Sequence, residues 1–243
     1  MRAILTYHAI DRSGSVISVS PEAFASHVAW LASGRVRVVS IAELLALPED
    51  CDAVALTFDD ALASVASEAA PLLADAGLHG TVFVVTDHVG GDNRWRGVTD
   101  PGIPVAAVLD WDALGRLVES GWSAGSHTRT HPHLPECSDA ALADELDGSA
   151  EAIAAGLGVT PDIFAYPYGD SDPRSTAAVA TRYAAACTTD YLPFDATPDP
   201  AMIPRLDAWY FRDGSAFRDW GSRRFRRGIA WRHALRRVRR MIG

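Results

Sequence analysis

Two adjacent carboxylates and a pair of spaced histidines are the residues of this sequence best suited to catalysis or metal binding. Asp59 and Asp60 directly follow the apolar residues 54–58, and His127 and His131 lie four positions apart. Adjacent acids repel each other unless a positive charge lies nearby, and a bound metal ion would supply that charge. Two imidazoles and one carboxylate form a three-ligand zinc set whose fourth position is left for water or substrate, as in catalytic zinc sites.

The same residues have simpler interpretations, which stay open at this point. The two histidines share one face only if their segment takes a helical turn, and they could belong to an ordinary surface loop, since His133 is close by. The two acids could cap a turn or a helix. A closed structural zinc site is a further alternative, although it leaves the acid pair unexplained. Its four ligands would be His127, His131, His133 and Cys137.

Predicted strands and helices alternate along the chain and would position these residues. The predicted strands are residues 3–7, 35–39, 54–58, 81–85, 122–126, 163–166, 185–189 and 202–206. The predicted helices begin after the N-caps Ser20, Ser40, Asp110 and Ser138, with two more at 62–76 and 173–182. This alternation predicts parallel strands with helical crossovers. The candidate residues follow strand carboxyl ends, where barrels of this class place their chemistry.

Three motifs, in chain order, resemble those of a known family. They are Thr57-Phe58-Asp59-Asp60, Ser126-His127-Thr128-Arg129-Thr130-His131 and Phe164-Ala165-Tyr166-Pro167-Tyr168-Gly169. They resemble the first three motifs of the polysaccharide deacetylases, also called the NodB-homology or carbohydrate esterase family 4 enzymes. The resemblance covers about residues 3–206. It is closest to the branch that deacetylates poly-β-1,6-N-acetylglucosamine, in the opening residues 5–10 (Leu-Thr-Tyr-His-Ala-Ile) and in the Phe-x-Tyr-Pro-Tyr-Gly form of the third motif. It implies an α/β fold, a distorted (β/α) barrel with fewer than eight regular strands.

The resemblance also implies a metal site with a catalytic base beside it. Asp60, His127 and His131 match the metal ligands, and zinc, cobalt or nickel would suit such a set. Asp59 matches the general base that deprotonates the metal-bound water. Adjacent acids can divide these tasks because successive side chains point in different directions.

Further positions match an oxyanion site and a general acid. The backbone N–H of Tyr168 matches the oxyanion donor, and Pro167 beside it is assigned to the substrate site. His8 matches the general acid of the branch that carries this histidine near its N-terminus, because the chain has no downstream Leu-x-His motif. An imidazole can protonate the poor amine leaving group near neutral pH. His8 could instead be a buried, hydrogen-bonded histidine at the end of a strand.

Two positions depart from the family pattern. Ala61 follows the acids where glycine is common, and alanine tolerates positive φ poorly, so we expect right-handed backbone or a shifted loop there. Ala165 stands where an arginine usually orients the base, and Arg205, just after the last predicted strand, is our hypothesis for its replacement. The aromatic residues could form a platform for a sugar ring, although such residues often belong to the core. The candidates are Trp95, Trp111, Tyr191 and Trp209.

The bulk composition suits one large globular domain. The chain has 243 residues, of which 48% are hydrophobic and 22% charged. Three cysteines at unrelated spacings argue against a disulfide framework and favour a reducing compartment. Without a signal-peptide pattern or a long apolar segment, we predict a cytoplasmic location.

The charge distribution divides the chain into an acidic body and a basic tail. All 22 basic residues are arginine, and 11 of them lie in residues 212–243, which carry a net charge of +9, against −18 for residues 1–211. Together with the resemblance, this division predicts a deacetylase domain at 1–211 and an amphipathic tail at 212–243. The tail could associate with the membrane surface, bind an acidic glycan or dock on its own domain. Nucleic acid is not an expected partner, because no recognition motif is present.

The apolar residues of this tail are predicted to form largely one helical stripe. They are Phe225, Ile229, Trp231, Leu235, Val238 and Ile242. For the whole chain, the sequence predicts a metal-dependent hydrolase that removes the acetyl group from an N-acetylated glycan. An O-deacetylase of the same architecture and a non-catalytic, metal-retaining carbohydrate-binding barrel remain alternatives.

Overall fold

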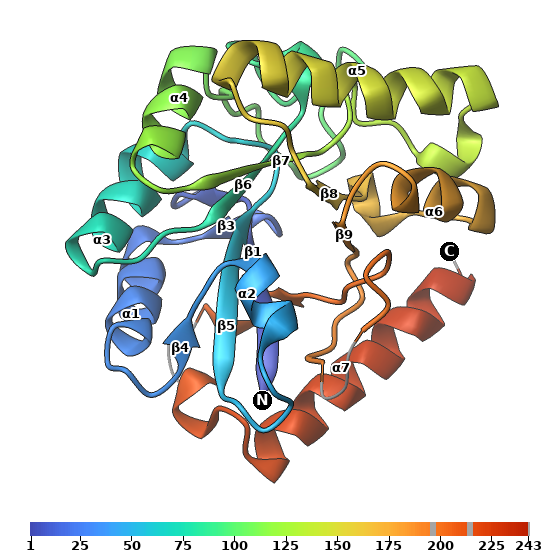
Figure 1. The fold of residues 1–243 in the computed structure, drawn as a ribbon. Coiled ribbons are helices and arrows are strands. Elements are labelled where there is room, and N and C mark those ends of the chain that lie inside the picture. Colours follow the sequence, from blue (N-terminus) through green and yellow to red (C-terminus); the bar gives the residue numbers. More distant parts are fainter. Residues whose placement is uncertain (195–197, 213–215, 243) are drawn as a thin grey trace.

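A curled, eight-stranded parallel sheet forms the centre of the computed structural model, which describes residues 1–194, 198–212 and 216–242 (Figure 1). The strand order is β10-β1-β5-β6-β7-β8-β9, and β4 pairs with β5. The bounds are β1 Arg2–Tyr7, β4 Arg37–Val38, β5 Ala53–Phe58, β6 Thr81–Val84, β7 Ser123–Ser126, β8 Ile163–Ala165, β9 Ala185–Cys187 and β10 Leu206–Asp207. A separate pair joins β2 (Ala9–Ile10) to β3 (Ser18–Val19). The result is the distorted (β/α) barrel that the sequence predicts.

The barrel is completed by irregular chain between its two terminal strands. Ile203 bridges to Cys187 of β9, and Leu206 of β10 pairs with Leu5 of β1. The predicted strand at 202–206 is therefore misplaced, since β10 begins at Leu206. Pro204 lies between the two pairings and has no backbone N–H to donate to a ladder, which interrupts the strand.

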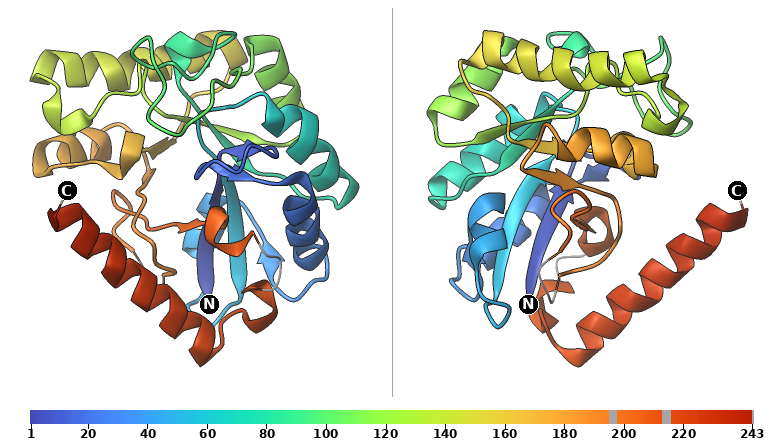
Figure 2. Two further views of the ribbon diagram at one scale, coloured as in Figure 1. Left: turned by 180° about the vertical axis from the view of Figure 1, so that it is seen from behind. Right: turned by 45° about the vertical axis from the view of Figure 1, so that its right-hand side comes forward.

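Helices lie outside the sheet, and those before the C-terminal helix α7 connect successive strands (Figures 1 and 2). Their bounds are α1 Pro21–Leu31, α2 Ile41–Ala46, α3 Ala70–Asp75, α4 Trp111–Glu119, α5 Asp139–Leu157, α6 Pro173–Ala180 and α7 Arg223–Ile242. Short turns are η1 Val65–Ala69, η2 Thr86–His88, η3 Leu134–Glu136, η4 Pro167–Gly169, η5 Ala208–Phe211 and η6 Ala216–Asp219. The four predicted N-caps are confirmed, because each side chain accepts a hydrogen bond from the third helical residue.

The predicted helix at 62–76 is shorter than expected and begins irregularly. Leu62 forms a bridge to Val108, and residues 65–69 form a π-helical turn before α3. Pro71 explains the wider turn, because proline cannot donate the hydrogen bond that an α-helix requires at that position.

The C-terminal helix packs on the body along one face only. Phe225 and Ile229 are 9% and 3% exposed and belong to the main core cluster, together with Phe217. Trp231, Leu235 and Val238 are 67%, 43% and 51% exposed. The prediction of one apolar stripe is therefore wrong, because these residues divide between two faces of α7. The side chain of Ile242 lies outside the described part of the chain.

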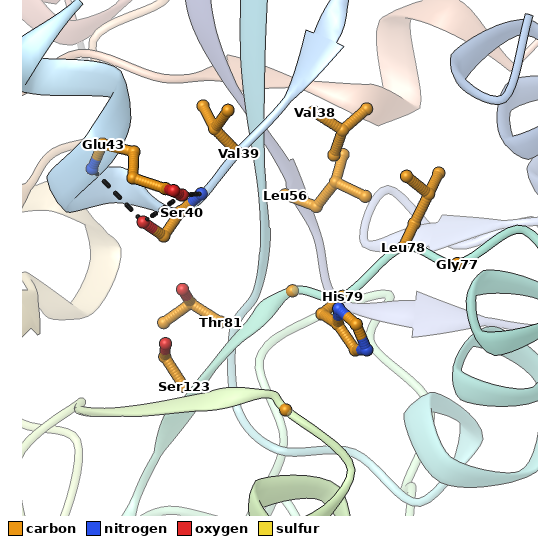
Figure 3. A pocket seen from close by; sticks show the side chains of 12 residues that line it. Val38, Val39, Ser40, Glu43, Leu56, Gly77, Leu78, His79, Thr81 and Ser123 are labelled. Atoms are coloured by element: carbon orange, nitrogen blue, oxygen red, sulfur yellow. Dashed lines mark hydrogen bonds between the residues drawn. The ribbon is translucent and has the colours of Figure 1, made fainter. Parts of the chain in front are cut away.

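Two further features of the fold bear on the tail and on binding sites. Among the described residues, no helix combines the length and the apolar composition needed to cross a bilayer. A cavity of about 200 Å3 lies at the amino ends of β6 and β7 (Figure 3). It opens because β4 and β6 pair with the same edge of β5, Val38 with Val54 and Thr81 with Thr57, so the sheet is split between them.

Candidate active site

The loops after β5 and β7 bring Asp60, His127 and His131 together. Oδ1 of Asp60 lies 3.6 Å from Nε2 of each histidine, and one candidate ligand atom from each residue lies within 4.8 Å of the other two. All three side chains are buried. The parallel sheet explains this convergence, because β5 and β7 both pair with β6 and end at the same edge. Spacing in the sequence alone did not require it.

Left-handed backbone shapes this site. The described non-glycine residues with positive φ all fall within or directly after the three motifs: Asp60 (68°), Ala61 (50°), Thr128 (69°), His131 (61°) and Tyr168 (59°). Such conformations cost about 1–2 kcal/mol each for ordinary residues. Strain of this kind persists where the surrounding structure holds it and is concentrated at functional sites.

The right-handed backbone considered for Ala61 is not found, since its φ is 50°. Its methyl group is completely buried, and its carbonyl oxygen accepts a hydrogen bond of 2.9 Å from the N–H of Leu109. Tertiary contacts therefore hold this residue in a conformation that its own preference disfavours. Alanine is the least bulky residue after glycine, so the position accommodates it.

The helical turn considered for the two histidines is also not formed. Thr128 and His131 are left-handed, and the segment is an irregular loop. Glu145 of α5 organises it by accepting hydrogen bonds from the N–H groups of Arg129 and Thr130 and from the Thr130 hydroxyl, at 2.6–2.9 Å. Sequence reasoning missed Glu145, although an acid on the buried face of α5 was a usable signal.

The chemistry of the three-residue set fits a divalent cation. Oδ1 of Asp60 and Nδ1 of His131 are buried without a hydrogen-bond partner, which is costly unless something else satisfies them. The other ring nitrogen of His127, Nδ1, lies 2.7 Å from the carbonyl oxygen of Ala165, an arrangement that fixes ligating histidines in metal sites. Burial lowers the pKa of both histidines, so they are neutral and able to bind metal.

Burial acts in the opposite direction on Asp60. It raises the pKa of this carboxyl group, and the nearby side chains of His8, His127 and Arg205 only partly offset the effect. A cation at the site would favour the ionised carboxylate. The donor set suits zinc, cobalt or nickel, the metals expected from the sequence.

The closed four-ligand zinc site does not form. Nδ1 of His133 pairs with Asp170 at 2.6 Å, and the thiol of Cys137 lies against the carbonyl oxygen of His133. Neither side chain joins the group formed by Asp60 and the two other histidines. The acid pair is consequently part of the site instead of an unrelated turn.

Arg205 holds Asp59 beside this group. The guanidinium group donates to both carboxylate oxygens of Asp59, at 2.7 Å each, and to the carbonyl oxygen of Thr188 at 3.0 Å. Both charged side chains are almost completely buried. Burial alone would raise the pKa of Asp59, but Arg205 and then His8 outweigh it and hold the pKa at about 2. Asp59 is therefore ionised throughout the neutral pH range.

His8 lies on the other side of Asp59. Its Nε2 is 3.8 Å from Oδ2 of Asp59, and its side chain is 24% exposed, so it can meet a substrate. His8 also lines a small cavity of about 30 Å3 with Asp207 and with Arg236 of α7. Burial raises the pKa of Asp207, which the sequence analysis missed even though it is an acid at a strand end.

Tyr168 and Trp95 cover the histidine side of the site. The ring of Tyr168 lies 4.5 Å from that of His131 and stacks on His133 at 4.0 Å. Trp95, from the long loop after β6, lies 5.0 Å from the His131 ring. Pro167 is buried and begins the turn η4, in which Tyr168 is left-handed.

The other predicted aromatic contacts are spread over different regions. Trp111 packs against Gly156, at the contact between α4 and α5. Tyr191 is buried in the core. The guanidinium group of Arg212 lies over the ring of Trp209, 3.9 Å from its centroid. Trp209 also lines a cavity of about 550 Å3 with residues of the loop after β2. The structure therefore does not assemble one platform from these side chains.

Known proteins share both the sequence pattern and the fold. The family model for polysaccharide deacetylase matches residues 46–186. The Bacillus subtilis protein YxkH, which carries the family's name, is 26% identical over 222 residues, covering 88% of this chain and 74% of its own length. The polysaccharide deacetylase BA0330 from Bacillus anthracis superimposes with a TM-score of 0.70 at 23% identity, over 85% of this chain and 64% of its own.

A third relative is a de-N-acetylase from Aggregatibacter actinomycetemcomitans. Its TM-score is 0.69 at 19% identity, over 84% of this chain and 94% of its own length. These structural likenesses establish the fold, and the family model covers all three motifs. With an Asp, His, His group at the place where these motifs meet in the barrel, the chain belongs to the polysaccharide deacetylase family of hydrolases.

Proposed function

We propose that this protein is a metal-dependent deacetylase that hydrolyses the N-acetyl group of an N-acetylated glycan. One observation carries the proposal: Asp60, His127 and His131 converge, while Arg205 holds Asp59 ionised beside them. A metal site alone would need only the first three residues. The buried Arg205–Asp59 pair adds a charged proton acceptor beside the three candidate ligands, which metal binding alone would not require.

The reaction adds water across the amide bond of the acetyl group. The C–N bond breaks, the water oxygen joins the acetyl carbon, and the sugar nitrogen leaves with a proton as a free amine. A divalent cation held by Asp60, His127 and His131 would polarise the acetyl carbonyl and make water at the site more acidic. Asp59 would accept the proton from water, because its carboxylate is ionised and fixed in orientation.

The remaining groups would act on the leaving group and on the developing negative charge. His8 is close to Asp59 and partly exposed, so it is placed to donate a proton to the amine. The resemblance assigns the oxyanion donor to the backbone N–H of Tyr168, whose left-handed conformation sets the direction of this group. Arg205 would position Asp59 without touching substrate.

The proposed substrate class is an N-acetylglucosamine oligomer or polymer, with β-1,6 linkage as the first candidate. The resemblance of residues 5–10 and of the third motif to the branch acting on that polymer supports this choice. The structural likeness to a de-N-acetylase also supports N-deacetylation. Trp95 and Tyr168 offer aromatic faces beside His131 for the acetyl group or the pyranose ring.

Acetate release from β-1,6-linked and β-1,4-linked N-acetylglucosamine oligomers tests the proposal. The purified protein should release acetate, lose this activity with a chelator and regain it with added zinc or cobalt. Asp59→Asn should release acetate at least about a hundredfold more slowly, whereas Asp75→Asn, a matched change at an exposed position, should behave as the unmodified protein. Release only from acetate esters would indicate an O-deacetylase. Bound metal without acetate release from any acetylated glycan would favour a binding module.

A further inference from the structure

The outer face of α7 carries apolar and basic side chains that the body of the protein does not cover. Trp231, Leu235 and Val238 are exposed, and so are Arg224 and Arg227. Their spacing of three or four residues places all five on one stripe of the helix. The helix therefore presents a continuous surface with arginines at its first turns and apolar side chains further along.

A second stripe of the same helix accounts for its docking on the protein. Phe225 and Ile229 enter the core, Arg232 donates to the carbonyl oxygen of Tyr210 at 3.2 Å, and Arg236 donates to that of Thr189 at 3.2 Å. These residues lie about one third of a turn away from the outer stripe. These contacts dock the helix on the body without using the outer stripe, so folding does not explain the composition of that stripe.

We propose that the outer stripe of α7 binds the surface of an anionic lipid bilayer. The helix contains no acidic residue, and residues 212–243 carry a net charge of +9. Basic residues beside an anionic membrane contribute about 1 kcal/mol each. Tryptophan prefers the interface between headgroups and acyl chains, and a helix with an apolar face and flanking arginines lies in that plane.

Other occupants of this surface fit less well. The apolar side chains that the structure describes on this stripe are three, and they cover much less than the ~800 Å2 that each partner buries in a standard protein interface, so a second copy of the chain is disfavoured. An acidic glycan would pair with the arginines but would leave Leu235 and Val238 in water. A bilayer accommodates both kinds of side chain.

The docking of α7 ties this surface to the candidate active site. Arg236, on the inner stripe, lines the small cavity that also contains His8 and Asp207, and its guanidinium lies 3.9 Å from the Asp207 carboxylate. The binding proposal itself does not depend on the proposed deacetylase activity.

Co-sedimentation with lipid vesicles tests the proposal with the full chain. Vesicles of phosphatidylcholine with about 30% phosphatidylglycerol should bind the protein, vesicles of phosphatidylcholine alone should bind it much less, and salt should weaken binding. A triple variant, Trp231→Ser, Leu235→Ser and Val238→Ser, should reduce the partition coefficient by at least about tenfold. Its melting temperature should remain unchanged, because the inner stripe is intact.

Charge variants provide a matched control. Arg224→Glu with Arg227→Glu should weaken binding by at least about tenfold at low salt, since both residues belong to the outer stripe. Arg35→Glu with Arg37→Glu makes the same change in net charge at exposed positions outside α7 and should change binding by less than about threefold. Equal binding by the unmodified protein and the triple variant would overturn the proposal. A dimer that the triple variant converts to a monomer would also overturn it, by assigning the stripe to a second copy.

Discussion

The two ends of the parallel strands differ in which residues adopt positive φ and in whether their polar groups are paired. Around the cavity of Figure 3, at the amino ends of β6 and β7, positive φ occurs at glycines such as Gly77 and Gly121, and Ser40 forms a reciprocal capping box with Glu43. At the carboxyl ends, positive φ occurs at Asp60, His131 and other non-glycine residues, and buried polar atoms have no partner.

This difference separates the end that stabilises the fold from the end that is built for chemistry. Glycine turns and capping boxes are low in energy and are satisfied by neighbours in sequence. Asp60 and His131 combine positive φ with unpaired side-chain atoms, which is high in energy. They persist because tertiary contacts such as those of Glu145 hold the surrounding loop. Substitutions of the candidate residues at the carboxyl ends should consequently reduce activity, whereas substitutions around the cavity should reduce stability and leave activity nearly unchanged.

The largest effect on activity is expected for Asp60→Ala. This change removes one of three candidate ligands, so bound metal should be lost and acetate release should fall by at least about a thousandfold. Metal content and acetate release measured on the same sample check both expectations. Activity that survives the change and persists in chelator would show that the carboxyl-end cluster is not a metal centre.

Asp59→Asn is expected to separate catalysis from metal binding. Loss of a general base should slow acetate release by roughly 10²–10⁴-fold, whereas the metal content should stay the same. Asparagine keeps the size of the side chain and removes its charge. Loss of the metal together with the activity would contradict the division of tasks between the two acids and would make Asp59 a ligand.

Arg205→Met is expected to show how strongly the structure holds the base. Removing one partner of a buried ion pair leaves the Asp59 charge uncompensated and should cost about 3–5 kcal/mol in the free energy of unfolding. Urea denaturation measures this change. The double variant with Asp59→Asn should recover part of the loss, and a strictly additive result would contradict a direct coupling between the two residues. Unchanged activity in a folded Arg205→Ala variant would remove its proposed role as a positioning residue.

His8→Gln is expected to affect amide and ester substrates unequally. An amine leaves poorly without a proton, so amide hydrolysis should fall by roughly 100-fold or more. An alcohol leaves more easily, so hydrolysis of an acetate ester at the same site should fall by less than about tenfold. Parallel assays with an N-acetyl and an O-acetyl substrate compare the two. Equal losses on both substrates would argue against His8 as the proton donor.

Ser40→Ala should give the smallest change and tests the amino end. Loss of the N-cap of α2 should cost about 0.5–2 kcal/mol of stability. Acetate release should stay within about twofold, because Ser40 lines the cavity at the other end of the strands from the candidate site. A large loss of activity would show that the two ends are coupled.

Much of the site could be predicted because its chemically active residues lie in short local motifs. The acid pair follows β5, the histidine pair follows β7, and parallel strands bring such ends to one edge. The helix starts were predictable for the same reason, since an N-cap bonds to a residue three positions away. The arginine beside Asp59 was only a hypothesis, because nothing local marks Arg205, 146 residues away along the chain.

The sequence by itself determined the donor types, the strand ends that carry them and the concentration of arginine in the tail. Tertiary structure alone decided the left-handed backbone at Ala61 and His131, the use of Glu145 to hold the histidine loop, and the division of α7 into two faces. The physical reason is the separation along the chain of the groups that interact. Caps and strand patterns depend on neighbours within a few residues, whereas strain, burial and ion pairing depend on groups that meet only after the barrel has formed.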